Sequence, residues 1–94
     1  MEGSVVEVSV PSELWPRRSD WEGRVVTVYK SPGDRVAPGE VVVEVEIEKA
    51  ILAIESPVGG VVEEVLARPG DHVGPGSTLL RVRLGGEDQA QDQA

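Results

Sequence analysis

An internal duplication constrains the fold of this chain more than any other feature of its sequence. Sliding the chain by 37 residues lays Gly23–Glu46 over Gly60–Arg83, and ten of the 24 aligned positions are identical. The string Pro-Gly-Asp-x-Val-x-Pro-Gly begins at Pro32 and again at Pro69. Valine-rich strands and Pro-Gly turns recur in any small β domain, but that does not explain the fixed offset. Because a solenoid needs about three or more repeats, two copies indicate one compact unit built from similar halves.

The hydrophobic pattern within each half indicates strands rather than helices. Valines at 6, 8 and 10 alternate with polar residues, and so do the apolar residues at 43, 45 and 47, which is the period of a half-buried strand. We expect further strands near 24–29, 61–67 and 78–84, separated by Pro-Gly clusters at 31–40, 56–60 and 68–77. No stretch of ten residues has helical spacing. The pattern predicts an all-β domain, either a small antiparallel sandwich or a flattened barrel.

The polar residues near the Pro-Gly clusters are interpreted as structural. Asp34 and Asp71 each follow a Pro-Gly pair, so we expect them to accept backbone N–H bonds within turns and to have no catalytic role. His72 is expected in a turn, without a metal or catalytic partner. Lys30 precedes Ser-Pro-Gly and is expected at a strand end in solvent, unmodified.

Composition excludes several classes of function. The 94 residues include 17 acidic and 9 basic side chains, a formal charge of −8 that argues against binding a phosphate backbone. The chain has no cysteine, and therefore no disulfide or cysteine metal site. Its apolar runs are far shorter than the ~20 residues of a membrane helix, and its first residues lack the features of a secretory signal. We therefore expect a cytoplasmic protein with no nucleic-acid or membrane partner. Residues 85–94 contain no large apolar side chain and are expected to form a flexible polar tail or linker.

Lys49 is the strongest candidate for a functional residue. It is one of two lysines, and the period-two pattern continues beyond it through Ala50, Leu52 and Ile54. A straight strand would place the Lys49 ammonium on the apolar face, which costs several kcal/mol when it is unpaired. The chain should therefore turn at this point and hold Lys49 at the tip of a hairpin, where its amine is available for covalent modification.

Two segments around Lys49 carry a family resemblance. The sequence Glu-Ile-Glu-Lys-Ala at 46–50 and Ser-Pro-Val-Gly-Gly at 56–60 resemble the lipoyl domain of 2-oxoacid dehydrogenase complexes. That family carries its attachment lysine in an Asp-Lys-Ala turn, and Glu48 replaces the usual aspartate. The resemblance extends from Val5 to Val82 and includes both Pro-Gly-Asp-x-Val segments.

The resemblance implies a fold and a function. The fold is two four-stranded antiparallel sheets related by a pseudo-twofold axis, a barrel-sandwich hybrid, in a carrier domain of residues 1–84. The function is that of a non-catalytic carrier, with lipoate joined by an amide to Lys49 by a lipoate ligase or lipoyl synthase. The implied partners are a thiamine-dependent 2-oxoacid decarboxylase that loads the lipoyl arm, an acyltransferase catalytic domain that receives the acyl group, and dihydrolipoamide dehydrogenase, which reoxidises the arm.

The resemblance also suggests recognition residues around the lysine. Glu44, Glu46 and Glu48 would form an acidic outward face, and modifying enzymes of the family are thought to use the glutamate three residues before the lysine, here Glu46. Ala50 completes the motif. The alternative is a solvated strand face that discourages edge pairing.

The long loop after the first strand is a second candidate for recognition. It covers Ser12 to Asp20, and in the family this loop lies beside the lysine turn. Within it, Trp15 is expected to be exposed and to contact partners, whereas Trp21 is expected to cap the core. The alternative is that both tryptophans cap the core.

Three other functions remain open at this stage. A biotin carrier has the same fold but usually flanks its lysine with methionines, whereas Met1 is the only methionine here. A glycine-cleavage H protein is usually longer and adds helices. An unmodified barrel-sandwich module would use Lys49 as an ordinary surface residue.

Overall fold

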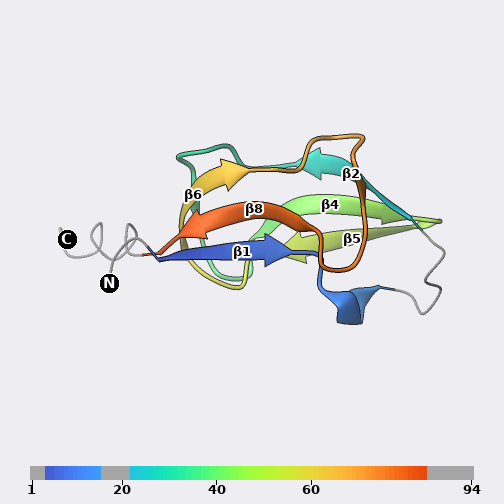
Figure 1. Ribbon diagram of the computed structural model, residues 1–94, viewed down its shortest axis with the longest axis horizontal. Coiled ribbons are helices and arrows are strands. Elements are labelled where there is room, and N and C mark those ends of the chain that lie inside the picture. The colour runs from blue at the N-terminus through green and yellow to red at the C-terminus, as the bar shows by residue number, and fades with distance from the viewer. Residues whose placement is uncertain (1–3, 16–21, 85–94) are drawn as a thin grey trace.

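Two four-stranded antiparallel sheets packed face to face form the protein (Figure 1). The computed structural model describes residues 4–15 and 22–84. Its elements are β1 (Val5–Ser9), the 3-10 helix η1 (Ser12–Leu14), β2 (Gly23–Val28), β3 (Arg35–Val36), β4 (Val41–Ile47), β5 (Ala50–Glu55), β6 (Gly60–Val65), β7 (His72–Val73) and β8 (Thr78–Arg83). The strand orders are β1-β8-β6-β3 and β5-β4-β2-β7, and no strand pairing within these described residues closes the two sheets into a barrel. The prediction of an all-β sandwich is confirmed.

The two halves of the duplication exchange a short strand. β3 belongs to the first repeat but pairs with β6 of the second, and β7 belongs to the second repeat but pairs with β2 of the first. The flanking hydrogen bonds match: Gly33 N–H donates to the Val62 carbonyl and Gly70 N–H to the Val25 carbonyl, both at 2.8 Å. The 37-residue offset is therefore a pseudo-twofold relation in space, and neither half completes a sheet alone.

The duplicated aspartates close equivalent turns. Asp34 Oδ2 accepts the Ser31 N–H at 2.8 Å, and Asp71 Oδ2 accepts the Arg68 N–H at 3.0 Å. The preceding glycines have φ of 94° and 95°, a region that favours glycine. The prediction that these aspartates are turn residues is confirmed.

β3 and β7 correct the sequence interpretation, because both lie inside Pro-Gly clusters that we expected to contain only turns. Each strand has two residues, too few to produce an alternating pattern. His72 is consequently not a turn residue: it begins β7 and pairs with Arg24 of β2.

The core lies between the sheets and consists mainly of valine, isoleucine and leucine from the inward face of each strand. The fully buried side chains are Val8, Val10, Val25, Val42, Val43, Val45, Ile47, Ile54, Val62, Leu79, Leu80 and Val82. Burying each one contributes roughly 1.5–3 kcal/mol. This burial fixes the register of the strands, because a one-residue slip turns every inward side chain to solvent.

Trp15 also belongs to this core, so the expectation of an exposed Trp15 is wrong. Its side chain follows η1 and is only 8% exposed. The ring lies over Gly23, where an added β-carbon would come within 2.7 Å of Trp15 Cη2. The large apolar area of the indole favours burial in a core that has no phenylalanine, although its Nε1 is buried without a hydrogen-bond partner. The rest of the predicted recognition loop, residues 16–20, and Trp21 lie outside the described residues, as does the predicted tail.

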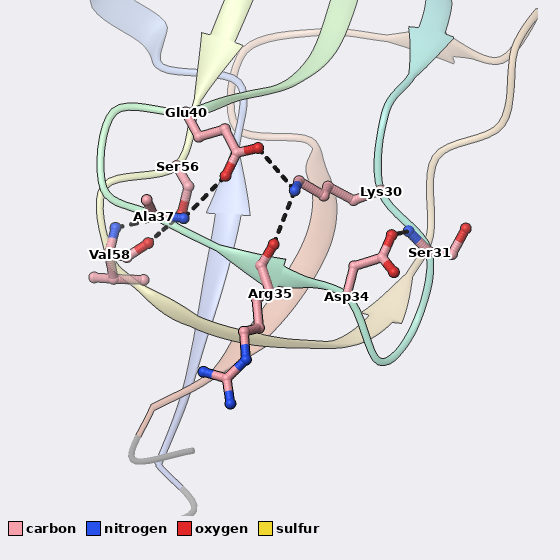
Figure 2. A network of polar contacts seen from close by, with 8 residues as sticks. All are labelled: Lys30, Ser31, Asp34, Arg35, Ala37, Glu40, Ser56 and Val58. Carbon is pink, nitrogen blue, oxygen red and sulfur yellow. Dashed lines mark hydrogen bonds and ion pairs between the residues drawn. The ribbon is translucent and has the colours of Figure 1, made fainter. Parts of the chain in front are cut away.

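Lys30 also differs from the sequence expectation of a side chain in solvent. Its side chain is 14% exposed, and its ammonium forms an ion pair with Glu40 at 2.8 Å and donates to the Arg35 carbonyl at 2.8 Å (Figure 2). The hydrogen bond from Lys30, together with the Ala37 N–H, lowers the pKa of Glu40. The ammonium therefore connects the end of β2 to β3 and to the start of β4.

The described part of the chain contains no helix long and apolar enough to cross a membrane.

Gly60, the duplicated counterpart of Gly23, allows a direct test of the packing of β6 against β8. An alanine at Gly60 would place its β-carbon 2.2 Å from the Arg83 carbonyl oxygen, so the backbone must move. We expect Gly60→Ala to lower the free energy of unfolding by about 1–3 kcal/mol. Gly74→Ala is the matched control, because nothing lies within 4 Å of its β-carbon position and its φ is not positive. Urea denaturation of both variants measures the difference, and equal stabilities would contradict the close approach of β6 and β8.

Candidate functional site

The hairpin of β4 and β5 holds Lys49 at one end of the molecule. Ile47 pairs with Ala50, so Glu48 and Lys49 form a two-residue loop, and the Lys49 side chain is exposed. The predicted hairpin tip is confirmed. In Figure 1 the tip lies at the right, whereas β1 begins and β8 ends at the left. There, Leu84 N–H donates to the Ser4 carbonyl at 2.8 Å, so the two ends of the described chain lie together, far from Lys49.

Packing fixes the tip relative to the core. Val45 and Ile47 are 0% and 1% exposed, so β4 is anchored up to its last residue. β5 pairs with it in register through Leu52 and Ala50. The lysine is therefore displayed on a rigid support rather than on a long loop.

Glu48 has an unusual backbone conformation. Its φ is 55°, and it is the only non-glycine residue in the described part of the chain with positive φ. Two-residue hairpin loops favour positive φ because it matches the right-handed twist of the flanking strands.

Four exposed side chains form a row across the β5-β4-β2-β7 sheet. Each is the second residue from the end of its strand that lies nearest Lys49. Ile51 pairs with Glu46, Glu46 with Arg24, and Arg24 with His72, so the row runs over β5, β4, β2 and β7. Beside it is an open hollow of about 230 Å³, lined by Glu22, Gly23, Arg24, Glu46, Glu48 and His72. His72 Nδ1 lies 3.3 Å from Glu22 Oε1 across its rim.

Three residues of the row, Arg24, His72 and Ile51, were not among the sequence-predicted site residues. They lie near Lys49 together with Glu46 and Glu48, which the sequence did predict, and Ile51 is 52% exposed. The pairing of β2 with β7 brings His72 here, and this long-range contact leaves no local signal in the sequence. Trp15 does not share this surface, because it is buried.

Electrostatics distinguishes the two sheets. On the outer face of the β1-β8-β6-β3 sheet, Arg81 forms ion pairs with Glu7 and Glu64, which raise the pKa of the arginine, chiefly through Glu64. Arg83 pairs with Glu63. By contrast, the carboxylates of Glu46 and Glu48, beside Lys49, form no ion pair or side-chain hydrogen bond within residues 4–15 and 22–84. The acidic character expected near Lys49 is therefore not neutralised by fixed partners.

Glu44 differs from the two glutamates beside the tip. It is half-buried, and its hydrogen bond with Tyr29 raises the pKa of that phenol. The acidic face predicted from Glu44, Glu46 and Glu48 is thus fully exposed only at Glu46 and Glu48.

Chemically, the site offers the exposed primary amine of Lys49. Within residues 4–15 and 22–84, no three histidine, aspartate or glutamate side chains are placed to hold a metal ion. An exposed primary amine on a tight turn suits acylation by an enzyme that grips the surrounding fold. The residues present therefore fit a covalently attached cofactor of the kind that forms an amide with lysine.

Comparison with known proteins also indicates a domain that carries a cofactor on a lysine. Residues 18–82 match the biotin/lipoyl family model, described as "Biotin-requiring enzyme". The solution structure of the lipoyl domain of the 2-oxoglutarate dehydrogenase complex from Azotobacter vinelandii is similar, with a TM-score of 0.65 and 28% identity. The match covers 86% of this chain and 98% of that one. A search of curated protein sequences found no match. The chain therefore belongs to the biotin/lipoyl attachment family and has the fold of a lipoyl domain.

Proposed function

We propose that Lys49 carries lipoate and that the domain transfers acyl groups within a 2-oxoacid dehydrogenase complex. The single observation that supports this most is the exposed Lys49 on a two-residue hairpin tip, in a chain that belongs to the attachment family. The lipoate carboxyl would form an amide with Nζ, with loss of water coupled to ATP cleavage by a ligase. When bound, the dithiolane supplies acyl-accepting and redox chemistry that no side chain here provides.

The protein's own contribution is presentation. The buried side chains of β4 hold the tip rigid, while Ser4 and Leu84, the ends of the described chain, lie at the opposite end. Anything joined to those ends would leave the lysine free to enter the active sites of a decarboxylase, an acyltransferase and dihydrolipoamide dehydrogenase in turn. The domain itself performs no catalysis in this proposal.

Lys49 should be the only acylated lysine. The second lysine, Lys30, is mostly buried and engaged by Glu40 and the Arg35 carbonyl, so its amine is not available as a nucleophile. We expect Lys49→Arg to abolish lipoylation, because arginine keeps the positive charge but has no nucleophilic amine. Lys30→Arg should load normally. Mass spectrometry after incubation with a lipoate ligase decides this, and a lipoyl adduct on Lys49→Arg would refute the site.

Biotin is the competing cofactor, because the family model covers both. Glu48 and Ala50 flank the lysine here, whereas biotin carriers usually have methionine on both sides. We expect a lipoate ligase to modify the wild-type domain fully and a biotin ligase to leave it unmodified under matched conditions. Efficient biotinylation without lipoylation would make this a carboxylase carrier, and no modification by either enzyme would favour an unmodified module.

The surface beside the lysine should determine how well the decarboxylase uses the loaded domain. Glu46 is exposed, has no ion-pair partner among the described residues and lies next to the tip, so it is available to a cationic group on a partner. Losing such a positioning contact raises the barrier for acyl transfer. We expect Glu46→Gln to lower the rate of reductive acylation about threefold to tenfold.

Glu55→Gln is the matched control, since Glu55 is exposed on the same hairpin but at the far end of β5. Both variants are lipoylated to completion before the rates are compared. Equal rates for wild type and Glu46→Gln would place the recognition surface elsewhere on the domain.

A further inference from the structure

Exposed apolar side chains follow β5 away from Lys49. Ile51 is 52% exposed, and Ala53, the next residue on the same face of the strand, is exposed as well. β5 is the edge strand of its sheet, so no described strand covers it on the side away from β4. Single exposed apolar residues are ordinary on protein surfaces, whereas a run of them that begins beside a functional group suggests a binding surface.

The run ends in a hollow beside the far half of β5. The hollow is open to solvent, has a volume of about 550 Å³ and is lined by Pro11, Leu14, Gly39, Ala53, Glu55, Ser56 and Pro57. Leu14 belongs to η1, the short blue helix after β1 in Figure 1, and is 48% exposed. Glu55 is the only charged residue among these lining residues, so the hollow suits an apolar group better than an ion.

The hollow lies within reach of a group attached to Lys49. Ala53 is four residues beyond Lys49, which is about 13 Å along an extended strand. A lysine acylated with lipoate has roughly eleven bonds from Cα to the dithiolane ring, and four residues of backbone have about twelve, so the two span similar lengths. An arm that lies along β5 over Ile51 therefore brings its ring to the near side of the hollow.

The chemistry of the attached group matches this surface. Its four methylenes and its dithiolane ring are apolar, and their contact with apolar side chains is favourable in proportion to the area removed from water. On the scale of ~30 Å³ for one water molecule, a five-atom ring fills only part of the hollow. The contact is therefore partial and reversible, which allows the arm to leave for a partner's active site.

We propose that Ile51, Ala53 and the hollow at Leu14 form a resting site for the lipoyl arm of the same chain. This proposal rests on the proposed lipoylation of Lys49. Ile51 contacts the methylene chain, and Leu14 and Ala53 contact the ring. While the ring rests there, its sulfur atoms are shielded from reagents in solution, but a partner enzyme that binds the arm can draw it away.

NMR of the lipoylated domain tests the contact directly. We expect NOEs between the dithiolane protons and the methyl groups of Leu14 and Ala53, and lipoylation should shift those methyl resonances. Val5 is the matched control, because it is 44% exposed but begins β1 at the end of the molecule away from Lys49 (Figure 1). The methyl resonances of Val5 should not shift.

The rate at which a small reductant reaches the ring measures how often the site is occupied. A neutral phosphine and water reduce the S–S bond to two thiols, and the phosphine is oxidised to its oxide. Because only the free arm reacts, the second-order rate constant falls in proportion to the resting fraction, and we expect Leu14→Ser to raise it about twofold to fivefold. Leu14→Met, which remains apolar, and Val5→Ser should keep the wild-type rate. Loss of the dithiolane absorbance follows the reaction.

The outcomes are distinct. Leu14 is half exposed, so its serine variant should fold, and Ala53→Gln takes its place if it does not. Absence of NOEs to Leu14 and Ala53 in a fully lipoylated domain, or equal phosphine rates in wild type and a folded variant of the hollow, would overturn the resting site and leave the proposed function intact. Shifts at Leu14 that appear only after a decarboxylase is added would also overturn it, by assigning the hollow to that partner. Failure of the wild-type domain to accept lipoate would instead refute the proposed function.

Discussion

Removal of water from the valine-rich faces between the two sheets is the constraint on which the rest of this structure depends. Val43, Val45 and Ile47 all point inward from β4, and a one-residue slip would expose all three. Their burial fixes the register of β4 against β5, and the register determines which two residues remain for the loop. The exposure of Lys49 is therefore a consequence of core packing several residues away.

The exchange of β3 and β7 joins the two halves of this small domain through strand pairing in both sheets. Each repeat contributes a strand to the sheet of the other, so separating the halves would break ladder pairs in both sheets. The relation extends to β1 and β5: Val10 N–H donates to the Ser77 carbonyl as Ser56 N–H does to the Glu40 carbonyl, both at 2.9 Å. In one half a hairpin loop joins the last two strands, and this is the lysine turn. In the other half, the position equivalent to the lysine turn is occupied by the start of β1 and the end of β8, where Leu84 N–H donates to the Ser4 carbonyl.

The sequence predicts those parts of the structure that local chemistry determines. Lys49 interrupts an apolar period, and Asp34 follows Pro-Gly, so both positions could be interpreted from their neighbours alone. Trp15 and Lys30 could not, because their burial depends on strands distant in sequence: Gly23 lies under the indole, and Glu40 accepts the ammonium. The same limit explains why two-residue strands were missed and why His72 was not placed beside the lysine turn.

Charge links the proposed acylation of Lys49 to what a partner would encounter at the tip. The unmodified tip combines the Lys49 ammonium with the carboxylates of Glu46 and Glu48, a sum of −1 from one positive and two negative groups. An amide on Nζ is neutral, so acylation changes that sum to −2. Neither carboxylate has a fixed partner among the described residues that would screen this change. A cationic partner surface would therefore be attracted more strongly to the loaded domain than to the unloaded one, most clearly at low ionic strength, where screening of exposed charges is weakest.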